Sequence, residues 1–166
     1  MSTIVDEATI QARLTETKPV VDPADLTPRK PKRGHLEAQK QVEGANGSKF
    51  RLILRQNRLD VQDFSVILGW EMPSLMRLFK LRRCNGRSHE HRNPLEQGEV
   101  FFDFHVHTAT ERYQIHGYSE EHAEPTGAYT DLRGAIRHLL ETCSFWRHAH
   151  SNRRLRGRCC DAAGAC

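Results

Sequence analysis

Apolar and polar residues alternate along several segments in the middle of the chain, and this alternation predicts β-strands. In the segment 50–55, one face carries three apolar residues, Phe50, Leu52 and Leu54, as the two-residue repeat of side chains along a strand requires. The preceding segment, 35–43, leads into Asn46-Gly47, a pair that is typical of a β-hairpin turn. Further strands are predicted over 64–70 and 75–83. Together these segments indicate an antiparallel sheet.

The clearest strand is predicted over 100–108, where the two faces differ in chemistry. One face is wholly apolar and is expected to pack into the core: Val100, Phe102, Phe104 and Val106. The other face becomes polar toward its end, with Asp103, His105 and His107. Because alternate residues of a strand face opposite sides of the sheet, this segment combines a core face with a face that carries a candidate site.

Near the end of the chain the apolar residues follow helical spacing instead. They form one face over 132–143, with Thr130 as the expected N-cap: Leu132, Ile136, Leu139, Leu140 and Cys143. A shorter and weaker helix is predicted over 3–17. The predicted fold class is α+β, an antiparallel sheet of about five strands with the C-terminal helix packed on its apolar face.

The prolines and the tail divide the chain into three parts. Residues 1–33 are expected to hold the weak N-terminal helix, loosely attached, and a linker rich in Pro and basic residues. Residues 34–146 are expected to form a single α+β domain. Residues 147–166 are basic and contain Cys159, Cys160 and Cys166, with little to bury, and are expected to be disordered. The five cysteines make no disulfide framework and are interpreted as reduced thiols.

The net charge of +4 in 166 residues belongs mainly to the tail. Residues 34–146 hold 14 Lys/Arg and 15 Asp/Glu, whereas residues 147–166 hold five cations and one acid. The basic pI therefore does not identify the domain as a nucleic-acid-binding protein. No run of 18 apolar residues and no secretory signal is present, so we expect a cytoplasmic protein with no membrane partner.

Two histidine pairs carry the candidate chemistry. His89 and His91 follow the Asn85-Gly86 turn, and His105 and His107 lie in the clearest strand. In extended chain, residues i and i+2 point the same way, so each pair projects two imidazoles from one side. The connection between the pairs is long enough to return the chain and bring the pairs together.

Three interpretations of the histidines remain open. One is acid–base chemistry on a phosphodiester, with neutral and protonated imidazoles as base and acid and arginines balancing the charge of the phosphate. A second is metal binding, because imidazole suits zinc, iron, nickel and copper. The third is a purely structural role in which the imidazoles pair with nearby acids. The chain has no glycine-rich phosphate loop, nucleophile elbow or Cys-x-x-Cys pair at zinc spacing, which disfavours the familiar kinds of nucleotide hydrolysis.

Six short segments resemble a small prokaryotic family of unknown function: 50–52, 55–57, 63–69, 85–93, 104–107 and 109–114. The layout of a basic strand, an Asn-Gly turn, a His-x-His and a final helix is also similar, more distantly, to the TumE-type toxins of toxin–antitoxin modules. This resemblance implies a small α+β protein that is restrained by a partner and has RNA as its target.

The leading hypothesis is therefore a toxin-like protein of a toxin–antitoxin module that acts on RNA, with an antitoxin as its partner. Its catalytic residues would be His89, His91, His105, His107 and Arg112, while Arg82 and Arg87 would hold phosphate. In this hypothesis the site needs no metal and no cofactor. One alternative is a non-catalytic protein-interaction domain of a defence or mobile-element cassette, and another is a metalloprotein that uses the same four histidines. The oligomeric state is not predicted.

Overall fold

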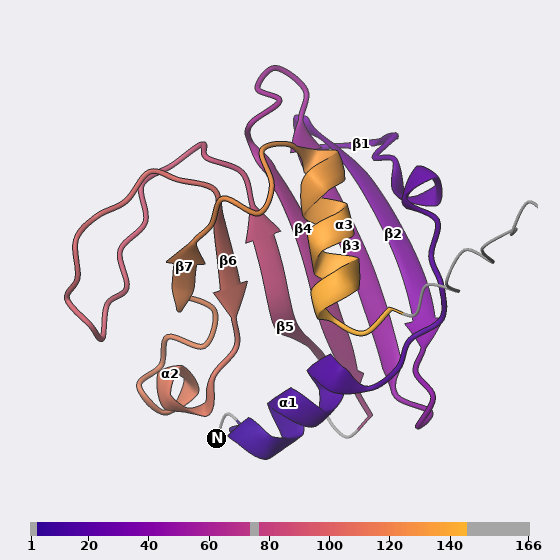
Figure 1. Cartoon of the computed structure of the whole chain (residues 1–166), viewed down its shortest axis with the longest axis vertical. Helices are drawn as coiled ribbons and strands as arrows, with labels where there is room; N and C mark the ends of the chain where they lie inside the picture. Colours follow the sequence, from indigo (N-terminus) through magenta and orange to yellow (C-terminus); the bar gives the residue numbers. More distant parts are fainter. Residues whose placement is uncertain (1–2, 74–76, 146–166) are drawn as a thin grey trace, which may run out of the picture.

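The protein is built on one seven-stranded antiparallel sheet whose strands follow each other in chain order (Figure 1). The computed structural model describes residues 3–73 and 77–145; the predicted tail, 147–166, lies outside them. The strands are β1 (Lys30–Lys32), β2 (His35–Glu43), β3 (Lys49–Asn57), β4 (Phe64–Met72), β5 (Arg77–Asn85), β6 (His105–Thr108) and β7 (Ala123–Pro125). The helices are α1 (Glu7–Thr15), α2 (Glu111–Ile115) and α3 (Leu132–Thr142), with a short 3₁₀ helix, η1 (Pro23–Leu26).

The predicted α+β class and the C-terminal helix are confirmed, but the predicted number of about five strands is wrong. The two shortest strands, β1 and β7, were not predicted. Each has three residues and pairs with one neighbour, so neither is long enough to show an alternating pattern in the sequence. β1 also falls within the segment that was predicted to be a linker.

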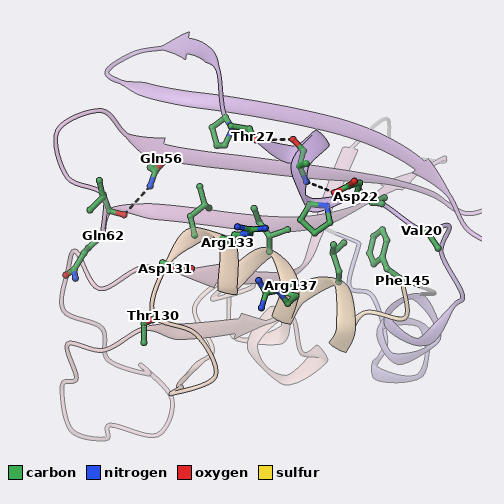
Figure 2. A pocket seen from close by; sticks show the side chains of 18 residues that line it. Val20, Asp22, Thr27, Gln56, Gln62, Thr130, Asp131, Arg133, Arg137 and Phe145 are labelled. Atoms are coloured by element: carbon green, nitrogen blue, oxygen red, sulfur yellow. Dashed lines mark hydrogen bonds between the residues drawn. The ribbon is translucent and has the colours of Figure 1, made fainter. Parts of the chain in front are cut away.

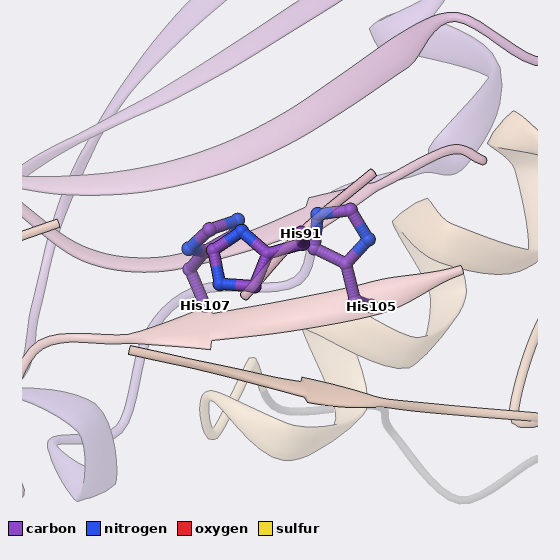
Figure 3. A group of neighbouring side chains, drawn as sticks. All are labelled: His91, His105 and His107. Atoms are coloured by element: carbon purple, nitrogen blue, oxygen red, sulfur yellow. The ribbon is translucent and has the colours of Figure 1, made fainter. Parts of the chain in front are cut away.

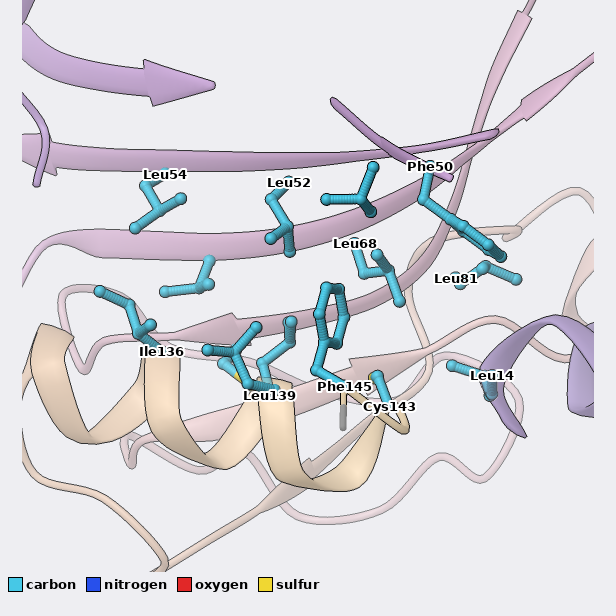
Figure 4. Packing of buried hydrophobic residues seen from close by; sticks show 14 of the residues in the cluster. Leu14, Phe50, Leu52, Leu54, Leu68, Leu81, Ile136, Leu139, Cys143 and Phe145 are labelled. Carbon is cyan, nitrogen blue, oxygen red and sulfur yellow. The ribbon is translucent and has the colours of Figure 1, made fainter. Parts of the chain in front are cut away.

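The register of the central strands places apolar side chains on one face of the sheet. Leu52 pairs with Leu68 and Leu54 with Val66 across β3 and β4, and these four side chains are fully buried. Helix α3 packs on this face through Ile136 and Leu139, among others (Figure 4). We call this the helix face and the opposite side the open face.

Helix α3 begins one residue later than the sequence suggested. Its N-cap is Asp131 rather than Thr130, because the Asp131 side chain accepts a hydrogen bond of 2.7 Å from the backbone N–H of Gly134. A carboxylate at this position also interacts favourably with the positive end of the helix dipole.

The N-terminal helix is part of the core and is not loosely attached. Ile10 and Leu14 of α1, and Leu26 of η1, are buried in the same hydrophobic cluster as the sheet and α3. Lys18 joins the two helices, since its ammonium group donates to Leu14 O near the end of α1 and to Cys143 O after α3. Burial lowers the pKa of Lys18 to about 8. A helix as short as α1 is only marginally stable by itself, and its packing against the sheet and α3 stabilises it.

The predicted strand 100–108 is largely a loop. Only His105–Thr108 forms β6, and Val100 and Phe102 are about half exposed, at 53% and 49%. The segment 86–104 instead turns over the open face, where His91 and Phe101 exchange two backbone hydrogen bonds of 2.9 Å. The face of β6 that was expected to be accessible is thereby covered, and His105 is completely buried.

Cys84 and Cys143 are free thiols and both are buried, and burial raises the pKa of Cys84 to about 12.

Among the described residues, no helix combines the length and apolarity needed to cross a membrane.

Candidate metal centre

The two histidine pairs meet on the open face of the sheet. Figure 3 shows three of the four rings, His91, His105 and His107, lying close together. The ring of His91 lies 5.3 Å from that of His105 and 4.9 Å from that of His107, measured between centroids. His105 and His107 are 5.0 Å apart, and His89 lies 5.3 Å from His105. The pair His89/His91 and the pair His105/His107, which come from separate segments of the chain, therefore form one cluster.

The sheet and the loop position these rings in different ways. His105 and His107 lie two residues apart on β6, so both rings lie on the open face. His91 reaches the cluster from the loop, which is fixed by its pairing with Phe101 and by Asn93. The Asn93 amide donates to Ala123 O at 2.8 Å and accepts from Ala123 N at 2.9 Å. The loop is thereby attached to β7, next to the strand that carries the other two rings.

Hydrogen bonds to backbone carbonyls assign the protons on two of the rings. His91 Nε2 lies 3.0 Å from Glu121 O, and His105 Nδ1 lies 2.7 Å from Asp103 O. A carbonyl oxygen only accepts, so these nitrogens carry the hydrogen and donate it. The other nitrogen of each ring, His91 Nδ1 and His105 Nε2, keeps its lone pair. His105 Nε2 accepts a long hydrogen bond of 3.3 Å from the Asn85 amide.

His107 differs from the other two because it has no such partner. Its side chain is buried, with 5% of the residue exposed. Neither ring nitrogen makes a well-formed hydrogen bond among the described residues, and the contact with the Glu120 backbone is the weakest of the influences on its pKa. Buried polar side-chain atoms are nearly always bonded in folded proteins. His107 is therefore the ring of the cluster whose nitrogens are the most available to a ligand.

The environment keeps the two β6 imidazoles neutral. The pKa of His105 is lowered to about 4, chiefly by burial and also by His91, His89 and Arg83, while the hydrogen bond to Asp103 O acts in the opposite direction. Burial together with Arg83 lowers the pKa of His107 to about 2. At neutral pH both rings are therefore uncharged, which is the form that binds metal ions.

Three of the rings could hold one metal ion. His91, His105 and His107 each offer a nitrogen, and these three atoms lie within 4.8 Å of one another. Nitrogens bound to one tetrahedral zinc ion lie roughly 3.3 Å apart, because each Zn–N bond is about 2.0–2.1 Å long. The three nitrogens would therefore have to move closer together to bind one ion.

Two polar side chains beside the cluster are also incompletely bonded. Arg83 and Asn85 of β5 lie opposite His107 and His105 in the sheet register. Arg83 Nε and Asn85 Oδ1 are buried and lack partners among the described residues. Next to Arg83 and His107, a cavity of about 10 Å³ also contacts Glu120, about the volume that one water molecule needs.

The three arginines that were predicted to act with the histidines lie elsewhere. Arg82 is on the helix face and donates to Thr142 O at 3.4 Å. The Arg87 guanidinium lies 5.9 Å from the centre of the Phe104 ring. Arg112 is exposed and forms an ion pair of 2.6 Å with Glu96. The structure therefore brings together the histidines but not Arg82, Arg87 or Arg112.

Arg83 lies beside the cluster, opposite His107, although the sequence pattern does not distinguish it from Arg82. Arg82 and Arg83 are neighbours on β5, so their side chains point to opposite faces of the sheet. The register of β4 with β5 shifts at Leu68/Gly69, and this irregularity prevents the sequence pattern from showing which arginine lies on which face. Asn85 had been interpreted only as part of a turn. In fact it ends β5 opposite His105.

Comparison with protein-family models, curated proteins and solved structures gave no match to this chain. Its fold and its site define an α+β protein with a buried three-histidine cluster on the open face of an antiparallel sheet.

Proposed function

We propose that this protein is a metalloprotein that binds one divalent transition-metal ion, most simply zinc, through His91, His105 and His107. The observation that carries the proposal is the convergence of three imidazole nitrogens within 4.8 Å, one of the rings being buried without a well-formed hydrogen bond in the described part of the chain. A metal ion would supply that missing partner to His107. It would also use the lone pairs that the carbonyl bonds leave on His91 and His105.

The hydrogen bonds around the rings support metal binding over a purely structural role. Metal-bound histidines almost always donate their other N–H to a carbonyl, carboxylate or water, which fixes the ring and its tautomer. His91 does so to Glu121 O and His105 to Asp103 O. The same hydrogen bonds leave His91 Nδ1 and His105 Nε2 as the acceptor nitrogens, and the bond that His105 Nε2 accepts from Asn85 is long, at 3.3 Å.

The number of ligands supports a site with an open position. Structural zinc sites usually have four protein ligands, whereas catalytic sites have three and leave the fourth position to water or substrate. His89 is exposed and lies beside His105 rather than in the group of three. The positive charge of Arg83 next to His107 favours an anion, such as hydroxide, as the fourth ligand.

The toxin and RNA hypothesis stays a prediction, but this geometry favours it less. A general acid needs a protonated imidazole, and the pKa values of His105 and His107 are lowered to about 4 and about 2. An RNA backbone would also need access to His105 and His107, whose rings are almost fully covered. The arginines assigned to phosphate lie away from these rings.

Zinc titration of the metal-stripped full chain by calorimetry tests the proposal. Cys159, Cys160 and Cys166 are replaced with serine in every sample, because thiolates would bind zinc independently. We expect one zinc ion per chain in this background. His105→Ala and His107→Ala should each weaken binding by about a hundredfold or more, since each removes a ligand, whereas His116→Ala, at an exposed position away from the cluster, should bind normally.

Two results would contradict the metalloprotein proposal. The first is that the serine background binds no zinc, cobalt or nickel. The second is that His105→Ala and His107→Ala, both shown to be folded by circular dichroism, bind zinc as tightly as His116→Ala.

A further inference from the structure

A second concave site lies on the helix face, away from the histidines (Figure 2). Helix α3 covers β4 and β5, while η1 packs on β2 (Figure 1). The residues that line the groove come from both helices, so it lies between them. Its volume is about 1060 Å³, at the upper end of the range of small-molecule pockets. The N-terminal segment, the turn between β3 and β4, and α3 form its walls.

The walls of the groove are largely apolar. The residues that give it this character are Val20, Val21, Pro23, Ile136, Leu140 and Phe145. Val20 is half exposed at 51%, and Val61 on the β3–β4 turn is 70% exposed. Apolar side chains that remain accessible along a groove of this size offer a surface that an alkyl chain can cover.

Two arginines add positive charge to this apolar surface. Arg133 and Arg137 lie one helical turn apart on α3, and both line the groove (Figure 2). Neither has a hydrogen bond or ion pair within the described part of the chain. The two acids in the lining are occupied, since Asp22 and Asp131 accept backbone hydrogen bonds as the N-caps of η1 and α3. Both acids keep their negative charge, so the lining is neutral overall. Among the described residues, Arg133 and Arg137 are the charged groups of the lining that make no hydrogen bond or ion pair, whereas the two carboxylates are held at the helix ends.

We propose that this groove binds an amphipathic anion, specifically a free long-chain carboxylate such as a fatty acid. The alkyl chain would lie against the apolar walls, and Arg133 and Arg137 would pair with the carboxylate. Guanidinium groups bind carboxylates through charge-assisted hydrogen bonds. The proposal does not depend on the metal site, which is on the other face of the sheet.

Calorimetric titration of the full chain with dodecanoate, below its micelle concentration, tests this proposal. We expect one dodecanoate per chain. Dodecanol, which lacks the charge, and hexanoate, which lacks most of the chain, should each bind at least about tenfold more weakly. The double variant Arg133→Gln/Arg137→Gln should lose at least about tenfold in dodecanoate affinity, and Arg77→Gln, at an exposed position outside the groove, should lose none.

The proposal is overturned if the unmodified protein does not bind dodecanoate, or if the double variant binds it as tightly as Arg77→Gln does. Equal binding of dodecanol and dodecanoate would also overturn it, because the arginines would then have no role. Thermal melting of each variant establishes that the fold is retained. These outcomes leave the zinc titration unaffected, so the two proposals are tested separately.

Discussion

At the level of single residues, His107 is the position where folding stability and the proposed function oppose each other. Its ring is buried and both nitrogens lack partners among the described residues. A buried polar group without a partner costs about 1–3 kcal/mol. Without metal, this imidazole therefore destabilises the folded protein, and a bound metal ion removes that cost.

Replacing His107 with leucine should separate the two effects. Leucine has a similar volume and no polar atoms, so His107→Leu should raise the free energy of unfolding of the metal-free protein by about 1–3 kcal/mol. Zinc should then no longer raise the melting temperature, because one ligand is gone. Urea denaturation with and without zinc measures both effects.

The exposed His116 provides the control for this substitution. His116→Ala should leave both the stability of the metal-free protein and its response to zinc unchanged. If His107→Leu instead destabilises the metal-free protein by several kcal/mol, the imidazole is a well-bonded part of the core and the assignment of an unsatisfied ligand is wrong.

At the level of elements, the segment 86–104 determines whether the site is assembled. It begins at Gly86, whose N–H donates to Phe64 O at 2.9 Å. A Cβ at this position would lie 1.8 Å from the backbone oxygen of Gln62 and 3.0 Å from the Phe64 ring. Only glycine lets the chain pass this close to β4 and start its return over the open face.

We therefore expect Gly86→Ala to displace the start of the segment. Overpacking of this kind costs about 1–3 kcal/mol of stability, and zinc affinity should fall as well because His91 belongs to the displaced segment. Gly98→Ala is the matched control, since a Cβ at Gly98 meets nothing within 4 Å. Urea denaturation and zinc titration of both variants test this, and equal behaviour of the two would show that Gly86 does not position the loop.

The elements differ in how well the sequence predicted them, for physical reasons. β2, β3, β4 and α3 carry patterns long enough to recognise, and they occur close to the predicted segments. The segment 100–104 has the same alternation, but in the described part of the chain it pairs only at separate points, Phe101 with His91 and Phe104 O with Thr126 N–H, and forms no continuous ladder. Local pattern therefore cannot distinguish a paired strand from an extended loop, because the difference lies in long-range pairing.

The sequence also predicts only part of the candidate site. The two His-x-His pairs and their shared direction follow from the sequence, since side chains two residues apart in extended chain share a face. Their burial does not, because it depends on the loop that covers them. Arg83 and Asn85 join the cluster only through the register of β5 with β6.

At the level of the whole molecule, the sheet separates two different sites. The helix face holds the core and the groove beside α3, and the open face holds the histidine cluster. The N-terminal segment contributes to the core through Ile10, Leu14 and Leu26, so the sheet, α1 and α3 form one hydrophobic unit. Such a scaffold can hold the three imidazoles in place before any ligand arrives.

X-ray absorption spectroscopy of the zinc-loaded full chain, with Cys159, Cys160 and Cys166 replaced by serine as in the titration, tests the central claim most directly, because it reports the atoms bound to the metal. We predict three imidazole nitrogens at about 2.0–2.1 Å and one further oxygen ligand. Sulfur at about 2.3 Å would assign the metal to cysteines instead. A shell with fewer than three imidazoles would likewise contradict the proposed site.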